Sequence, residues 1–216
     1  MEVEAAPTVS GTAVARRRRR TYASVFIIES LEFDDETAGR LEGDVLTQIL
    51  RLSGKDAEYR YIRTKKELEA VVGQFAESGM RYLHFSCHGN DGALFTTLDE
   101  VPFRELRRML QPHLKGRRVF VSACEAVNPA LAEALLPDTG CYSIIGPAGD
   151  VGFGDAAVMW AAFYHLMFKQ NASAMKGADI RAVLKALVNT FHVPMTYIRQ
   201  RPEHPFWREL PIEPDV

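Results

Sequence analysis

The chain has 216 residues, 47% of them hydrophobic and 25% charged, a composition that excludes a disordered chain and is typical of a globular domain. Its formal net charge of −2 excludes the strongly basic surface that nucleic-acid binding requires. The three cysteines, Cys87, Cys124 and Cys141, are too few for a disulfide framework, and their odd number on apolar segments favours a reducing, cytoplasmic location.

The N-terminal segment ends in a run of five arginines, Arg16 to Arg20. Like charges in such a run repel each other, so we predict a disordered basic tail at 1–20 and a single folded domain at 21–216. The apolar stretch that follows the arginines ends at Glu29, which is too short for the core of an export signal. A nucleic-acid arm and a site of proteolytic processing remain alternative interpretations of the tail.

The first half of the domain alternates between strand and helix patterns. An apolar run over 25–29 predicts a buried strand, and the polar–apolar alternation over 58–63 predicts a half-exposed one. Between them, a helix that ends near Ser53-Gly54 should face the core with Leu41, Val45, Ile49 and Leu52. Thr64 and Glu67 form a capping box, and the helix they open should bury Leu68, Val71, Val72 and Phe75.

The second half continues the alternation. We expect a short hairpin at 93–98 and a helix from Pro102, then a helix over 129–136, a strand over 141–145, and helices over 155–170 and 179–191. The apolar run at 156–168 is too short to span a bilayer, so we expect no membrane contact. The last 20 or so residues, rich in proline and charge, are expected to wrap over the surface. The pattern predicts an α/β fold: a mostly parallel sheet of about five strands with helices on both faces.

Two further strands end in residues that carry chemistry. One apolar run ends at His88-Gly89, and another runs from Arg118 into Cys124. Adjacent parallel strands would bring the histidine and the thiol together at their carboxyl ends, where open α/β sheets place their active sites. The imidazole can take the thiol proton, and the thiolate then attacks a carbonyl carbon. The N–H groups of Gly89 and Cys124 would stabilise the oxyanion, and a glycine would let the backbone approach the substrate.

A structural interpretation competes with the catalytic one for each of these residues. A cysteine at a strand end is more often part of the core than a nucleophile. Cys87 should point to the face opposite His88, so we expect Cys87 and Cys141 to be core residues. His84 shares a face with His88 but lies deeper in the strand, and we expect it to be a hydrogen-bonded core histidine.

Both strand ends resemble those of the caspase-fold cysteine peptidases, most closely the CHAT branch of that superfamily. The motifs concerned are His84-Phe85-Ser86-Cys87-His88-Gly89 and Ser122-Ala123-Cys124-Glu125, with weaker similarity at 144–147 and 163–166. The resemblance covers roughly 22–192 and implies a three-layer caspase-like sandwich. It also implies a Cys124–His88 dyad, an oxyanion hole that includes Gly89, and a protease that is made as a zymogen or switched on by a partner. A bacterial antiviral-defence or cell-death role is a further implication.

The sequence departs from animal caspases in ways that bear on specificity. Cys124 is not in a Gln-Ala-Cys-x-Gly motif, and it follows His88 by 36 residues rather than about 50. Cleavage after aspartate is therefore not expected. Acids gather near the expected site, and among them Asp150 and Asp155 are our candidates for binding an Arg or Lys before the scissile bond. The competing interpretation is that these are loop and cap residues, with Asp155 as an N-cap.

We therefore expect a cysteine endopeptidase that needs no metal or cofactor and acts on a protein substrate. An activating or regulatory protein partner and a homodimer are compatible with this, whereas a nucleic-acid partner is not expected. A preference for basic residues would make Arg16 to Arg20 a self-cleavage site in the tail. The main alternative is a catalytically silent caspase-like scaffold. A nucleotide- or flavin-binding α/β protein would need a glycine-rich turn after the first strand, and 28–32 contains none.

Overall fold

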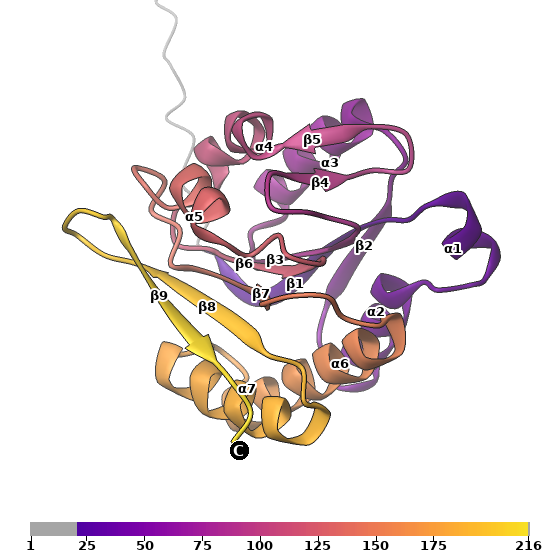
Figure 1. The fold of residues 1–216 in the computed structure, drawn as a ribbon. Coiled ribbons are helices and arrows are strands. Elements are labelled where there is room, and N and C mark those ends of the chain that lie inside the picture. The colour runs from indigo at the N-terminus through magenta and orange to yellow at the C-terminus, as the bar shows by residue number, and fades with distance from the viewer. Residues whose placement is uncertain (1–20, 216) are drawn as a thin grey trace, which may run out of the picture.

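The structure, a computed structural model, describes residues 21–215. The tail predicted for 1–20, with its arginine run, lies outside the described residues, so the domain boundary stays a prediction. Within the described part, seven strands form one sheet in the order β2-β1-β3-β6-β7-β8-β9, and two short strands, β4 and β5, form a separate hairpin (Figure 1).

The strands of the large sheet are β1 (Tyr22–Ser30), β2 (Ala57–Tyr61), β3 (Met80–Cys87), β6 (Arg118–Ser122), β7 (Ser143–Pro147), β8 (Met195–Gln200) and β9 (Trp207–Ile212). The hairpin consists of β4 (Ala93–Phe95) and β5 (Glu100–Pro102). The helices are α1 (Phe33–Thr37), α2 (Glu42–Leu52), α3 (Lys65–Ser78), α4 (Phe103–Leu110), α5 (Pro129–Leu135), α6 (Phe153–Gln170) and α7 (Gly177–Phe191). These elements confirm the predicted alternation of strand and helix.

Strands β2, β1, β3, β6 and β7 pair in parallel, whereas β7–β8 and β8–β9 pair antiparallel, which confirms a mostly parallel sheet. The prediction of a surface wrap over the last 20 residues is wrong, because this segment extends the sheet by an antiparallel hairpin. Residues 195–198 are buried against the core, but β9 is an edge strand with one exposed face. A proline is tolerated on such an edge, so Pro211 did not exclude a strand.

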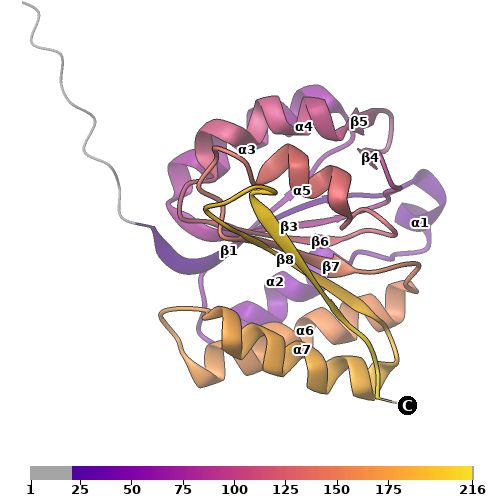
Figure 2. The same ribbon diagram turned by 60° about the vertical axis from the view of Figure 1, so that its left-hand side comes forward.

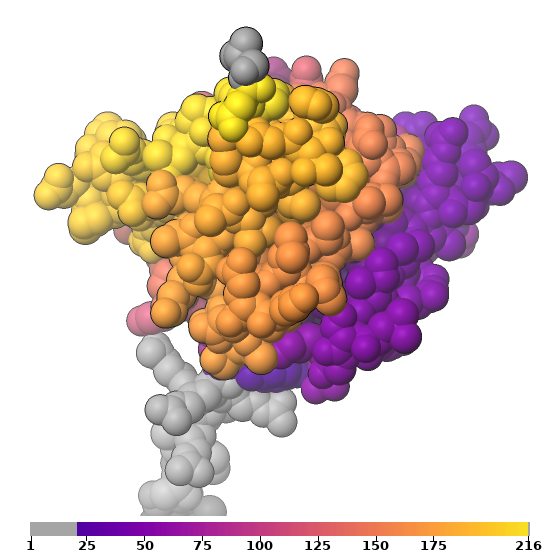
Figure 3. Space-filling view, turned by 90° about the horizontal axis from the view of Figure 1, so that it is seen from below, coloured from indigo at the N-terminus to yellow at the C-terminus, as the bar shows by residue number. Residues whose placement is uncertain are grey.

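Three layers result from this arrangement. Helices α3, α4 and α5 cover one face of the sheet, and α2, α6 and α7 cover the other (Figures 1 and 2). The α3 side of the core is mainly aliphatic, whereas the α6 side is built around contacting rings, namely those of Tyr82, Phe120, Trp160, Phe163 and Tyr164. Figure 3 shows how closely the side chains of α2, α6 and α7 close over that face.

The helix caps follow the sequence, but one predicted helix face does not. As predicted, α3 begins at the Thr64 capping box and ends at Gly79, whose backbone is in the left-handed conformation. In α2, however, Leu52 is 88% exposed, and the buried stripe is instead Gly43, Leu46, Thr47 and Leu50. The reason is a close approach: a Cβ on Gly43 would lie 2.9 Å from Cγ2 of Ile27 on β1. Because only glycine fits there, α2 turns this stripe, and not the predicted one, towards the sheet.

The connections change direction between β1 and β3. The chain leaves β1 through α2 to reach β2 on one side, and it leaves β3 through α4 to reach β6 on the other. In parallel sheets such a switch point leaves a crevice at the carboxyl ends of the strands. The segments after β1, β3 and β6 therefore meet at one edge of the sheet. None of the described helices combines the length and apolarity needed to cross a membrane.

Candidate active site

The two strands that carry His88 and Cys124 are neighbours in the sheet. Strands β3 and β6 pair in parallel, with Ser86 opposite Ser122 as the last pair. His88 and Cys124 each lie two residues beyond this pair, and so the predicted placement of the two side by side at the carboxyl edge agrees with the register. The side chain of His88 is 34% exposed, and Cys124 is partly exposed and unoxidised. Both groups can therefore be reached from solvent.

Gly89 packs against the turn that carries the cysteine. A Cβ on Gly89 would lie 3.0 Å from the Cβ of Ala123, 3.1 Å from that of Ala126 and 3.3 Å from the carbonyl oxygen of Cys124. We expected glycine here to make room for a substrate, but the close approach is to atoms of the turn that carries Cys124. The missing side chain thus holds the histidine and cysteine turns together.

The backbone N–H groups of Gly89 and Cys124 are free to bind an anion. Gly89 forms a bridge with Leu94 in which the hydrogen bonds are made by the flanking residues, so its own N–H points away from the hairpin. Within residues 21–215, neither this N–H nor that of Cys124 donates a hydrogen bond to another residue. The predicted oxyanion donors are therefore unoccupied, as the proposed role requires.

The turn after Cys124 is held in an uncommon conformation. Glu125 has φ = 54°, a left-handed value that costs a residue with a side chain about 1 kcal/mol or more. The amide of Asn128 donates to the carbonyl oxygens of Glu125 and Asp91, at 3.0 Å each. The side-chain oxygen of Asn128 also accepts from the N–H of Leu131 as the N-cap of α5. One side chain therefore fixes the cysteine turn, the histidine loop and a helix start.

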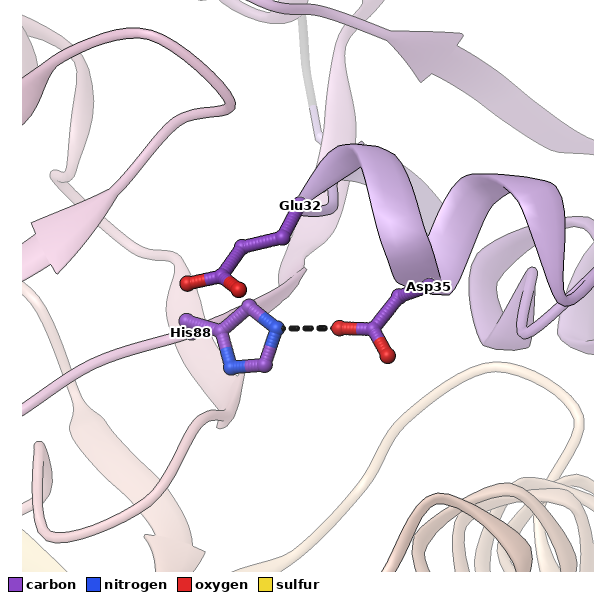
Figure 4. A group of neighbouring side chains, drawn as sticks. All are labelled: Glu32, Asp35 and His88. Carbon is purple, nitrogen blue, oxygen red and sulfur yellow. Dashed lines mark hydrogen bonds and ion pairs between the residues drawn. The ribbon is translucent and has the colours of Figure 1, made fainter.

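Asp35 orients the imidazole of His88. Nε2 of His88 lies 2.7 Å from Oδ2 of Asp35, which follows β1 in the short helix α1 (Figure 4). The other carboxylate oxygen accepts from Arg40 at 2.6 Å, and the ring of Phe153 packs edge-on against the imidazole at 5.7 Å. An ionised carboxylate can only accept, so Nε2 carries the proton and Nδ1 is left as the basic nitrogen. This pairing was not predicted from the sequence.

The charge of Asp35 is maintained by its partners. Burial raises the pKa of its carboxyl, but the hydrogen bonds from His88 and Arg40 outweigh this effect and hold the pKa below its ordinary value. Asp35 is therefore ionised throughout the neutral range. Such a carboxylate stabilises the imidazolium that forms when a thiol gives up its proton.

The thiol of Cys124 is not hydrogen-bonded to His88 among the interactions of residues 21–215. Catalytic hydrogen bonds are often long or misaligned in ligand-free structures and tighten when substrate binds. The arrangement therefore supplies the two groups at adjacent strand ends, and substrate binding must bring them into contact.

A buried acidic network lies beneath the two strand ends, on the α6 side of the sheet. Ser86 donates to Glu29 at 3.2 Å, and Ser122 donates to Glu42 at 2.8 Å. Glu29 also accepts from the N–H of Gly43 at 2.7 Å, and no lysine or arginine pairs with either carboxylate among the described residues. Burial raises the pKa of Glu29, although its hydrogen bonds oppose the shift. The network anchors both strands two residues before the candidate dyad.

His84 and Cys141 are core residues, as predicted, whereas Cys87 is only partly buried and packs against the core. His84 is fully buried, and its Nδ1 lies 2.9 Å from the hydroxyl of Tyr164. Cys87 packs in the aliphatic layer and Cys141 is fully buried. Burial raises the pKa of each of these two thiols to about 12. A thiol with such a pKa is scarcely ionised at neutral pH, and Cys124 remains the candidate nucleophile.

Asp150 and Asp155 lie beside the site without reaching the dyad. Both are exposed, one in the loop after β7 and the other in the first turn of α6, on either side of the Phe153 that contacts His88. The cap interpretation of Asp155 is wrong, because Gly152 is the N-cap residue of α6 and no side chain caps it. Neither carboxylate has a hydrogen-bond or ion-pair partner within residues 21–215. Their role in substrate binding stays a prediction.

One group of side chains could hold a metal ion. The ligand atoms of Glu32, Asp35 and His88 lie within 4.8 Å of one another (Figure 4). The ion pair between His88 and Asp35 explains their proximity without a metal, and Glu32 is exposed. The groups required for the predicted chemistry are complete in the chain itself.

No protein-family model matches the chain, and no curated protein sequence does. Among solved structures, it resembles a secreted C11 cysteine protease from Bacteroides thetaiotaomicron, with a TM-score of 0.56 and 11% identity over 84% of this chain and 67% of that one. It also resembles caspase-1 from Spodoptera frugiperda, with a TM-score of 0.51 and 14% identity over 86% and 84% of the two chains. These likenesses confirm the caspase-like fold, and at such identities they bear on the fold alone.

Proposed function

We propose that this chain is a cysteine endopeptidase in which Cys124 is the nucleophile and His88 the general base. The observation that carries the proposal is the register of β3 and β6, which pairs Ser86 with Ser122, two residues before His88 and Cys124. Nδ1 of His88 takes the thiol proton, and the sulfur attacks the carbonyl carbon of the scissile bond. The N–H groups of Gly89 and Cys124 then bind the oxyanion.

The second half of the reaction uses the same groups. His88 returns the proton to the leaving amine as the C–N bond breaks, and a thioester to Cys124 remains. A water molecule, deprotonated by His88, attacks the thioester, and the thiol leaves with a free carboxylic acid as the product. Asp35 holds the imidazole in the required tautomer during both steps. No metal or cofactor takes part in this scheme.

We extend the proposal to a preference for Arg or Lys before the scissile bond. The acyl part of the substrate must lie on the β7 side of Cys124, because His88 occupies the β1 side. Asp150 and Asp155 are unpaired within the described residues and lie in the segment that leaves β7 and enters α6, and carboxylates bind guanidinium and ammonium groups by charged hydrogen bonds. The resemblance of the motifs to the CHAT branch further suggests a cytoplasmic protease, switched on by a partner or by cleavage, in a defence or cell-death pathway.

A peptide-library digestion tests the proposal. The purified chain is incubated with a proteome-derived peptide mixture, and new termini are identified by mass spectrometry. We expect cleavage after Arg and Lys, lost in Cys124→Ala and His88→Ala but kept in Cys87→Ala. Asp150→Asn and Asp155→Asn should weaken the basic preference without abolishing cleavage. A folded chain with no Cys124-dependent cleavage would favour the alternative of a silent caspase-like scaffold.

A further inference from the structure

A second acidic surface lies on the other side of His88. A cavity of about 260 Å³ opens where the end of β1 faces the β4–β5 hairpin, at the switch point of the sheet. Its walls are Ser30, Leu31 and Glu32 after β1, residues 95–100 of the hairpin, and His88 itself. Pockets for whole ligands usually measure about 300–1,000 Å³, so this volume suits part of a ligand.

The position of the cavity relates it to one side of the scissile bond. The sheet order is β1-β3-β6, so His88 on β3 lies between the cavity and Cys124 on β6, and Cys124 is not part of the cavity wall. The acyl part of a substrate bonds to the nucleophile, whereas the leaving amine takes its proton from the base. The residues that follow the scissile bond therefore lie over the histidine side.

We propose that this cavity is the subsite for the residues just after the scissile bond and that it selects Lys or Arg there. The inference rests on the proposed function, and it adds a second specificity element that is independent of Asp150 and Asp155.

The charge of the cavity determines the substrate class. Three acids, Glu32, Asp99 and Glu100, belong to its wall, and no lysine or arginine does. Asp99 accepts from the backbone N–H of Lys65 at 2.7 Å, whereas the side chains of Lys65 and Arg63 are paired with Glu105 and Glu36. Within the described residues the carboxylates of Glu32 and Glu100 have no partner, and a bound peptide would therefore meet their negative charge beside the base. A cationic side chain is attracted by this charge, and an acidic one is repelled.

The shape of the cavity suits a long side chain with a charged end. Its apolar wall includes Leu31, Phe95 and Leu98, and Leu98 is 59% exposed with no partner to cover it in the described chain. The methylene stem of Lys or Arg packs on such a surface while its head stays near carboxylates and water. The walls are also fixed to each other, because the hydroxyl of Thr97 donates to the carbonyl oxygen of Leu31 at 2.7 Å. The cavity is thus preformed.

The test uses quenched fluorescent peptides that share one sequence before the scissile bond. They differ only in the first two positions after it, which carry Lys, Arg, norleucine or Glu. We expect kcat/KM for a Lys or Arg peptide to exceed that of the norleucine peptide by about tenfold, and the Glu peptide to be slower still. Raising the salt from 0.05 to 0.5 M should shrink the difference, because the acids are largely exposed.

The variants Glu32→Gln and Glu100→Gln separate this inference from the proposed function. Glu100 is not grouped with His88, so Glu100→Gln should cleave the norleucine peptide at the normal rate. The Glu32 carboxylate lies within 4.8 Å of an imidazole nitrogen of His88, so for Glu32→Gln the ratio of the rates on the Lys and norleucine peptides is compared instead. Their preference for Lys and Arg should fall to about threefold or less, whereas Asp150→Asn should leave it unchanged. Cys124-dependent cleavage without any basic preference after the bond overturns the inference and leaves the proposed function intact. A chain that cleaves no peptide refutes both.

Discussion

The two faces of the sheet differ sharply at the ends of β3 and β6. On the α3 side, Phe85, Cys87 and Val121 pack among aliphatic side chains. On the α6 side, the next residue in each strand is a serine bonded to a buried carboxylate, and His88 and Cys124 follow. Because side chains alternate along a strand, a shift of one residue exchanges these environments. The difference teaches that the pattern of alternation, more than the residue type, decides which cysteine can react.

The largest expected effect compares the two faces directly through thiol reactivity. At pH 7.5, Cys124 should react with iodoacetamide at least about 10³-fold faster than Cys87 or Cys141, because a pKa of about 12 leaves those two thiols almost wholly protonated. Peptide mapping of alkylated sites over time measures the three rates. Equal rates at Cys87 and Cys124 would contradict the assignment, and measurement in denaturant provides the control in which the difference disappears.

The next effect concerns the positioning of the base. Asp35→Asn should lower kcat about 10²-fold with little change in KM, because the amide cannot fix the productive tautomer of His88. The matched control is Asp34→Asn, which changes an exposed neighbouring acid. A merely structural role for Asp35 would leave kcat of the folded variant unchanged. Asp35→Glu should restore part of the loss if orientation is what the carboxylate supplies.

The same residue makes the stability of the fold pH-dependent. The pKa of Asp35 is lower in the folded chain than the value of about 3.9 expected when unfolded, so its ionised form stabilises the fold above that pH. This contribution is lost as the pH falls through the folded pKa. In urea denaturation, the free energy of unfolding of the wild type should therefore exceed that of Asp35→Asn by a constant amount from pH 5 to 7. This difference should disappear below pH 4. A difference that widens in acid would contradict the assigned direction.

A smaller effect should come from the serine beneath the nucleophile. Ser122→Ala removes a donor from the buried carboxylate of Glu42, which should destabilise the chain by about 1–3 kcal/mol and also reduce kcat. Val121→Ala, on the aliphatic face of the same strand, should cost similar stability through a cavity but spare kcat. Chemical denaturation and single-turnover assays of the two variants measure both quantities. Equal losses of kcat would mean that the polar face has no special role.

The smallest effect is a gain in stability. Glu125→Gly should raise the free energy of unfolding by up to about 1 kcal/mol, because glycine adopts a φ of 54° without a steric penalty. Glu133→Gly, inside α5, should instead lower it by about as much. Thermal denaturation distinguishes the two variants. A loss of stability in Glu125→Gly would show that the strain at this turn is absent.

Much of this architecture could be predicted, because the spacing of apolar residues and the capping residues indicate the strands and most of the helices. The register of β3 and β6 was accessible from their similar endings. Three features were not. The pairing of Asp35 with His88 joins residues 53 apart through a loop with no pattern of its own. The burial of Glu42 depends on Gly43, whose close contact with β1 is a tertiary event. The β9 strand was hidden by Pro211 and by charges on its exposed face.

Gly43 shows that a substitution far from the reacting atoms can disturb the candidate active site. A methyl group there would collide with Ile27, and α2 would have to move outward to admit it. That movement would withdraw the N–H that Glu29 accepts and carry Glu42 away from Ser122, so both strand ends would lose their anchors together. In a saturation-mutagenesis map, position 43 should therefore tolerate substitution nearly as poorly as position 124, although Gly43 takes no part in the reaction.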